Sequence, residues 1–514
     1  MTSSQKRGGF ADSLKVLFYA SSFLGLLPFS LREFYSKHVL KISVIANVWV
    51  VVNLVFYTTT YHLATDVYSD TDRNSQGTLT SAIGLFIIYM EPLMMITDMI
   101  ASMVNQKRLI DCVSRLDKVD NKLAGENITI RNNRIQKNIL ILIGLVLLFE
   151  SMLTTYNFVV FSEVYTAWSL IWFLTAFPTG INSLSRIWFV SLVVAVRHRF
   201  FAMNNHMDEL AGLLEEHNDR WEDELEIERN EIPMNYLERE IFTIRSHRKA
   251  FVQPALQGNR KIGDIQTKVI DVKPFEKKVQ DEKQLAQKRS VFGFLSFEKH
   301  MKIDEKLDKK MILICRMHDE LCEIGKSINH MYSFQMLVSM AHGFMAITAQ
   351  FYFLYCALSG QEVPVLFRSA QVVQISVVQI FYVAFKCVIC IYVCWKTKTE
   401  SKRTGVYMHH LANMVDETHF YQIVNHLSLK LLNHQLNFSA CGFFDLDMTT
   451  LYAITGAITS YLIILIQFNL AAMQKTGTNV TDTGNNGTGN ATLDALNVTL
   501  TTVSTALSTY VTNP

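Results

Sequence analysis

The stretch Thr449–Met473 reads TTLYAITGAITSYLIILIQFNLAAM and contains no charged residue. An apolar run of about 20 residues is long enough to cross the ~30 Å hydrocarbon core of a bilayer as an α-helix. The stretch therefore predicts a membrane-spanning helix near the end of the chain.

The composition of the whole chain is that of a protein with several such helices. Of its 514 residues, 49% are hydrophobic and 18% are charged, whereas soluble proteins average about 25% charged residues. The mean hydropathy is +0.17. The net charge of +2 provides no basic field that would suit nucleic acid. We expect an all-α integral membrane protein that contacts lipid and binds no nucleic acid.

Seven apolar runs are long enough to span the membrane. They are Lys41–Ala64, Ser81–Val104, Asn138–Phe161, Thr166–Val196, Met331–Ala357, Ser369–Trp395 and Thr449–Met473. A shorter run, Leu14–Phe29, is followed by Arg32 and Glu33 rather than by a small-residue cleavage site. We interpret it as an amphipathic helix on the cytoplasmic membrane surface, with a signal anchor as the alternative.

Basic residues gather on one side of the predicted membrane. Residues 1–41 carry six Lys and Arg, and the loop between the second and third runs carries eight. The opposite side holds only Arg73, Arg368 and Lys475. Because basic residues resist translocation, the N-terminus is predicted inside and the C-terminus outside. This inverted topology argues against a G-protein-coupled receptor.

The segments between the runs differ in character. Apolar residues recur at helical spacing in 200–226 and 303–328, which predicts cytoplasmic extensions of helices four and five that pack together. The lysine-rich part, about 229–296, lacks this periodicity and is predicted to be a flexible insertion, or alternatively a partner-binding loop.

In chain order we expect an N-terminal segment with the surface helix in 1–40, helices one to four in 41–196, a cytoplasmic loop in 197–330, helices five and six in 331–395, a cytoplasmic anchor segment in 396–448, helix seven in 449–473 and an extracellular tail in 474–514.

The tail carries four N-x-Thr sequons, at Asn479, Asn486, Asn490 and Asn497. Four such acceptors within a short polar segment predict a glycosylated, extracellular tail.

The sequence shows no sign of catalysis. It lacks a Gly-rich phosphate loop, a His-Glu-x-x-His motif and a nucleophile elbow, so we expect no enzyme and no cofactor. Cys387, Cys390 and Cys394 share one face of helix six, but no His lies near them, which favours packing over zinc ligation. We therefore expect no metal.

Five ionisable residues lie inside the predicted spans, where desolvation is costly. A structural ion-pair network is the favoured interpretation, and the alternative is that Glu91 and Glu150 face a cavity. The five are Glu91, Asp98, Glu150, Arg186 and Lys386.

The second half of helix seven has a mixed stripe. Helical geometry places Ser460, Ile464, Gln467 and Ala471 on one side. Such a stripe suits a shared polar path with an apolar constriction. An ordinary helix–helix interface with Gln467 as hydrogen-bonding partner is the alternative.

The run Ser460–Phe468 resembles the Thr-Tyr-(five apolar)-Gln-Phe signature of insect gustatory receptors, with Ser460 replacing the usual Thr. Other stretches are similar to members of that family associated with bitter taste. They are Gly25–Phe29, Cys322–Lys326, Thr348–Ala357, Phe367–Ala370, Ser401–Gly405, Ile423–Asn433 and Phe438–Phe444.

The resemblance implies a subunit of a tastant-gated, non-selective cation channel that responds to bitter small molecules such as caffeine. It also implies a homo- or hetero-tetramer with other gustatory receptors, in the plasma membrane of gustatory neuron dendrites and axons. A non-conducting obligatory co-receptor and a receptor for another ligand class, such as sugars, are the alternatives. The pore and gate positions that it implies are Ser460, Tyr461, Ile464, Gln467 and Phe468.

The same resemblance implies a ligand pocket in the outer half of helices two to six. Aromatic faces would stack on a planar ligand, and Gln or Glu would bind its polar edge. The residues expected at that depth are Phe86, Glu91, Trp168, Trp172, Gln350, Tyr352, Gln374 and Gln379.

The inverted topology is directly testable. A tag placed after Pro514 should be labelled by antibody on intact cells, whereas a tag before Met1 should require permeabilisation, because the basic loops hold the N-terminus inside. Labelling of the N-terminal tag on intact cells would contradict the predicted orientation.

Overall fold

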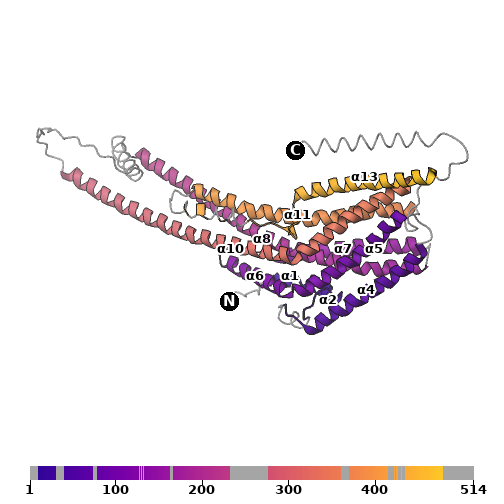
Figure 1. Cartoon of the computed structure of the whole chain (residues 1–514). Coiled ribbons are helices and arrows are strands. Elements are labelled where there is room, and N and C mark those ends of the chain that lie inside the picture. The colour runs from indigo at the N-terminus through magenta and orange to yellow at the C-terminus, as the bar shows by residue number, and fades with distance from the viewer. Residues whose placement is uncertain are drawn as a thin grey trace, which may run out of the picture. The chain divides into compact units, whose positions relative to one another are not determined.

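The computed structural model describes residues 10–30, 40–72, 78–126, 128, 130, 132–162, 166–231, 276–359, 370–414, 422, 424–426, 430 and 435–478. These residues are mostly helical (Figure 1). The elements are α1 (Phe10–Ser13), α2 (Lys15–Phe23), α4 (Val44–Asp72), α5 (Thr78–Val104), α6 (Gln106–Gly125), α7 (Asn132–Ser162), α8 (Thr166–Glu231), α10 (Glu276–Leu358), α11 (Ala370–Met414), β1 (Ser439–Ala440), β2 (Phe444–Asp445) and α13 (Met448–Thr478).

Six stretches of the described helices are long and apolar enough to cross a membrane. Each overlaps one of the predicted runs, and the remaining run, Ser81–Val104, forms most of α5. The prediction of a helical membrane protein is thereby confirmed, while the count of seven spans and their orientation stay predictions. The six stretches are Val44–Leu63, Ile135–Tyr156, Ala176–Glu215, Lys309–Leu358, Ser376–Asn413 and Met448–Ala471.

The chain divides into two compact units. One comprises Met1–Ala202, Glu320–Ser401 and Gln435–Pro514, and it holds most of the apolar helices. The other comprises Met203–Asp319 and Lys402–His434. Within this second unit Thr404 donates a hydrogen bond to Asn204 at 2.8 Å, and Cys315 contacts Met408.

Helices α8 and α10 continue without a break through the two predicted extensions, 200–226 and 303–328. The flexible insertion over 229–296 stays a prediction, although α8 reaches Glu231 and α10 begins at Glu276, so both of its ends are helical. This part is rich in Lys, Glu and Gln, which are good helix formers even without an apolar stripe. Residues 232–275 lie outside the described residues.

The N-terminal helix packs into the protein rather than resting only on a membrane surface. Leu17 and Phe18 are fully buried, and the indole of Trp188 on α8 donates a hydrogen bond to Ser21 at 2.8 Å. The apolar periodicity of this face serves packing against the bundle, and the location of the helix at the membrane surface stays a prediction. Phe23, 80% exposed, remains on the outside.

Helix α6 was not predicted, because charged residues recur along it too often for a membrane span. It is amphipathic and turns its apolar stripe, including Leu109, Leu116 and Leu123, into the protein. The Arg115 guanidinium on its other side pairs with Glu320 of α10 at 2.7 Å. This ion pair holds the pKa of Arg115 above its usual value.

Candidate functional site

Among the described residues, helix α13 packs on its neighbours through one face. Leu462 and Leu465 contact a buried cluster on α10 formed by Ala349, Tyr352, Phe353 and Cys356. On the same side, Asn469 donates to the sulfur of Cys356 at 3.3 Å. In Figure 1 the yellow α13 runs beside the C-terminal part of α10.

The other face of α13 is exposed and carries the mixed stripe. Ser460, Ile464, Gln467 and Ala471 all lie on it, with Ile464 43% exposed. The neighbouring Phe468 is 64% exposed. The described part of the chain thus leaves this polar and apolar stripe uncovered.

Tyr461 differs from the other predicted pore residues. Its ring is 55% exposed but packs edge-to-face on Phe344 of α10, with 5.5 Å between ring centroids. This contact fits a residue that supports the helix more than one that lines a path.

A buried cluster of ionisable side chains ties α7, α8 and α11 together. Glu150 accepts hydrogen bonds from the hydroxyls of Ser183 and Tyr382, the latter at 2.7 Å. The Lys386 ammonium lies 3.8 Å from the same carboxylate and 4.1 Å from the centre of the Tyr382 ring. Because each polar group has a partner, the bundle tolerates these charges, as the predicted ion-pair network requires.

A second part of the cluster surrounds Asp98 and Arg186. Gln335 of α10 donates to Asp98 at 3.0 Å and to Ser185 at 3.2 Å. Arg186 donates to Ser339 at 2.9 Å. Two further helices, α5 and α10, are thereby joined to α8 through polar contacts.

A small cavity of about 20 Å³ lies within this cluster, which is room for about one water molecule. Glu91 lines it and accepts a hydrogen bond from Thr179 at 2.9 Å. Asn182, a residue 2% exposed, also lines it, and its side-chain oxygen has no partner in the described chain. An unpaired buried acceptor is costly, so the cavity favours an occupant that donates a hydrogen bond.

The other predicted pocket residues divide into four groups. Gln350 of α10 donates to Gln379 of α11 at 3.1 Å, and its own side-chain oxygen has no partner in the described chain. Tyr352 lies in the cluster beneath α13, apart from the cavity lining. Phe86 and Gln374 are exposed, and the side chains of Trp168 and Trp172 lie outside the described residues, as do the four sequons at Asn479, Asn486, Asn490 and Asn497.

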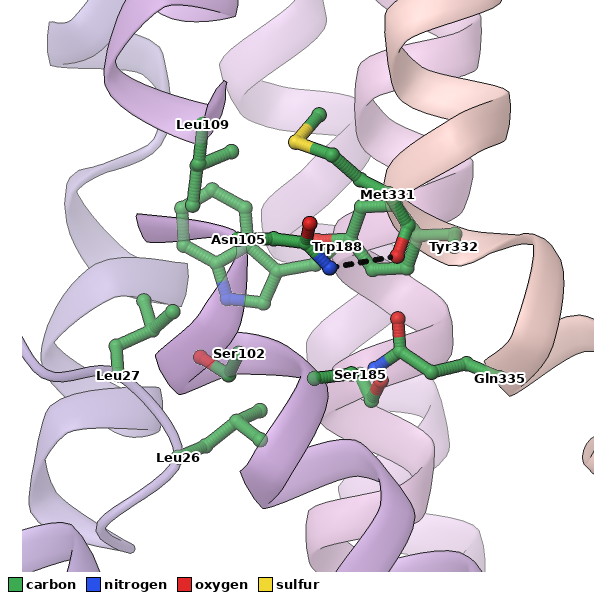
Figure 2. A pocket seen from close by; sticks show the side chains of 11 residues that line it. Leu26, Leu27, Ser102, Asn105, Leu109, Ser185, Trp188, Met331, Tyr332 and Gln335 are labelled. Carbon is green, nitrogen blue, oxygen red and sulfur yellow. Dashed lines mark hydrogen bonds between the residues drawn. The ribbon is translucent and has the colours of Figure 1, made fainter. Parts of the chain in front are cut away.

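A separate cavity, also of about 20 Å³, lies where the N-terminal segment meets α5, α6, α8 and α10 (Figure 2). Leu26 and Leu27 form one wall, and Gln335 lines the other. Asn105, at the break between α5 and α6, donates to the carbonyl of Met331 at 3.1 Å. No property of the sequence pointed to this cavity, because its lining comes from five separate segments.

The Glu150–Lys386 pair should be strongly coupled. Lys386→Met leaves a buried carboxylate without its cation and should lower the free energy of unfolding by about 3–5 kcal/mol. The double variant with Glu150→Gln should recover part of that loss, whereas Lys402→Met, at an exposed position of α11, should change stability by under about 0.5 kcal/mol. Thermal unfolding of purified protein in detergent measures these three variants and Glu150→Gln alone, and strictly additive effects of the two single changes would contradict the coupling.

Comparison with known proteins agrees with these features. The family model described as 7tm Chemosensory receptor matches residues 14–239 and 277–472. The Gustatory receptor for bitter taste 66a of Drosophila melanogaster is 37% identical over 473 residues, which cover 89% of each chain. The Putative gustatory receptor 28a of the same fly is 30% identical over 171 residues, 33% of this chain and 38% of that protein.

The fold is also that of a solved insect receptor. The olfactory receptor OR5 of Machilis hrabei superimposes with a TM-score of 0.54 and covers 89% of this chain and 98% of its own. At 12% identity this likeness concerns the fold alone. The chain therefore belongs to the 7tm chemosensory receptor family, and within it to the insect gustatory receptors of the bitter-taste type.

Proposed function

We propose that this chain is a subunit of a ligand-gated, non-selective cation channel whose pore is lined by α13 from several subunits. The observation that carries the proposal is the uncovered stripe of Ser460, Ile464 and Gln467. The Ser460 hydroxyl is paired with the Gly456 carbonyl at 3.0 Å, but the Gln467 amide facing lipid would be costly. The same amide facing water in a shared path can touch ions. Ile464 and Phe468 supply the bulk that closes such a path by dewetting.

The ligand in this proposal is a small bitter compound such as caffeine, bound between helices α5, α8, α10 and α11. Two side-chain oxygens that accept no hydrogen bond in the described chain support this location of the ligand site. They belong to Asn182 and Gln350. Glu91 adds a carboxylate at the same cavity as Asn182. Hydrogen-bond donors on the ligand would pair with these oxygens and offset the cost of burying them without a partner.

Assembly is proposed as a tetramer, either of this chain alone or with other gustatory receptors, in the plasma membrane of gustatory neuron dendrites and axons. The tail from residue 474 would be extracellular and glycosylated, and the part of the chain in 197–330 cytoplasmic. Signalling would proceed by ion flow, without enzyme activity or a cofactor. A non-conducting co-receptor with an intact fold, or a receptor for sugars, remains the second candidate, because the comparisons specify the family more closely than the ligand.

Gln467→Ala should alter permeation while leaving assembly intact, because it removes an amide from the uncovered stripe without touching the packed face. Phe468→Ala should raise the basal leak, since it removes bulk about 100° around the helix from Gln467. The measurement is whole-cell current in a caffeine-responsive subunit combination, with reversal potentials under ion substitution.

Leu462→Ala is the matched control, because Leu462 lies on the packed face against α10. It should lower surface expression and leave ion selectivity unchanged. Unaltered permeability, leak and ligand response for both stripe variants at normal surface level would refute the pore assignment.

A further inference from the structure

The segment that leads into α13 is fastened along α10. Residues 435–447 contain the two-stranded hairpin, in which Ser439 pairs with Asp445 and Ala440 with Phe444. The hairpin turn places Cys441 and Gly442 at positive φ, 52° and 78°. We call residues 435–447 the linker.

The first contact of the linker with α10 is at Gly325, where the missing side chain leaves a gap in the helix surface that we call the notch. A Cβ atom on Gly325 would lie 2.6 Å from the Cδ1 of Leu436, which is far inside van der Waals contact. Leu436 is 2% exposed, so its side chain fills the space that the absent Gly325 side chain leaves. Any larger residue at this position must displace the leucine.

Two more contacts continue along the same side of α10. The backbone N–H of Ser439 donates to the side-chain oxygen of Asn329 at 3.0 Å, and the Cys441 sulfur lies 3.7 Å from the Ser333 hydroxyl. Gly325, Asn329 and Ser333 are spaced four residues apart, which places them on one stripe of the helix. Three successive turns of α10 therefore hold three successive parts of the linker.

The linker is also joined rigidly to α13. Asp447 accepts hydrogen bonds from the backbone N–H groups of Thr449 and Thr450 at 3.0 and 3.2 Å, and so caps the first turn. The Thr449 hydroxyl donates to the same carboxylate and lowers the pKa of Asp447 below its usual value. Farther along, Tyr461 rests on Phe344 of α10.

The same helix α10 also lines the polar cavity, through Ser339, His342 and Gly343. One continuous helix thus contacts both the cavity and the whole path to α13. A shift at one end of a helix is passed to the other end because its backbone N–H and C=O groups are hydrogen-bonded to one another and its side chains are densely packed.

We propose that α10 and the linker move as one body, with Gly325 and Leu436 as the positioning residues that couple the polar cavity region of the bundle to the pore helix. This inference rests on the proposed channel function. It requires that the contacts between the linker and α10 persist in both the closed and the open channel.

The first test exchanges volume across the notch. In Gly325→Ala the new methyl group displaces the Leu436 side chain from the notch. This variant should reduce ligand-evoked current per surface channel about tenfold. The double variant Gly325→Ala/Leu436→Ala should restore most of the current, because the new methyl then meets a shortened partner. A loss in the single variant without rescue in the double one, or no loss in the single variant, would overturn the assignment of these positioning residues.

The second test joins linker and helix covalently. In Ser333→Cys, the membrane-permeant oxidant diamide should form a disulfide with the native Cys441, detected as the loss of two maleimide-reactive thiols and reversed by dithiothreitol. If the two elements move as one body, the evoked current stays within about twofold after oxidation. Abolition of the current in Ser333→Cys, but not in the Ser333→Ala control, would show that linker and α10 separate during gating.

These outcomes are distinguishable from failure of the channel proposal itself. The unmodified chain must first carry ligand-evoked current with its partner subunits, and that current must be sensitive to Gln467→Ala or to Phe468→Ala. If neither Gln467→Ala nor Phe468→Ala alters that current, the pore assignment fails before the coupling is measured.

Discussion

The one-sided packing of α13 on α10 is the constraint on which the rest of the account depends. A membrane helix can leave apolar side chains facing lipid at no cost, but hydroxyl and amide groups in hydrocarbon need partners. The packed face uses Leu462, Leu465 and Asn469, so Ser460 and Gln467 remain on the uncovered side. The Ser460 hydroxyl donates to the Gly456 carbonyl within α13 at 3.0 Å, so the exposed Gln467 amide is the group that needs a neighbouring subunit or water, and the proposed central pore supplies both.

Around α10, polar contacts take the role that apolar burial plays in soluble proteins. The drive for apolar association is weak between helices in lipid, so hydrogen bonds and close packing decide which helices meet. Glu150 joins α7 to α8 and α11, and Gln335 joins α10 to α5 and α8. Such contacts are directional, so they fix how the helices around the polar cavity are placed relative to one another.

Much of the fold could be predicted from the sequence because lipid imposes simple rules. Length and hydropathy located the apolar helices, and helical periodicity placed Ser460, Ile464 and Gln467 on one face of α13, which the structure leaves exposed. Periodicity failed where helices are charged throughout, as in α10 near Glu276, and where an amphipathic helix such as α6 lies outside the spans. Depth in the membrane does not say which pocket candidates face inward, and Phe86 and Gln374 are both exposed in the described structure. The notch at Gly325 could not be found at all, since its partner Leu436 lies more than a hundred residues away in sequence.

The central claim is that the uncovered face of α13 lines a conducting path. Single cysteines at Ser460, Ile464 and Gln467, and at the packed positions Leu462 and Leu465, can be tested with a cationic methanethiosulfonate reagent during ligand-evoked current. The account predicts irreversible block at the three stripe positions, protection by closure of the channel, and no effect at the two packed positions or in the parent chain. Block confined to the packed positions, or no block at any stripe position in a channel that conducts, would contradict it.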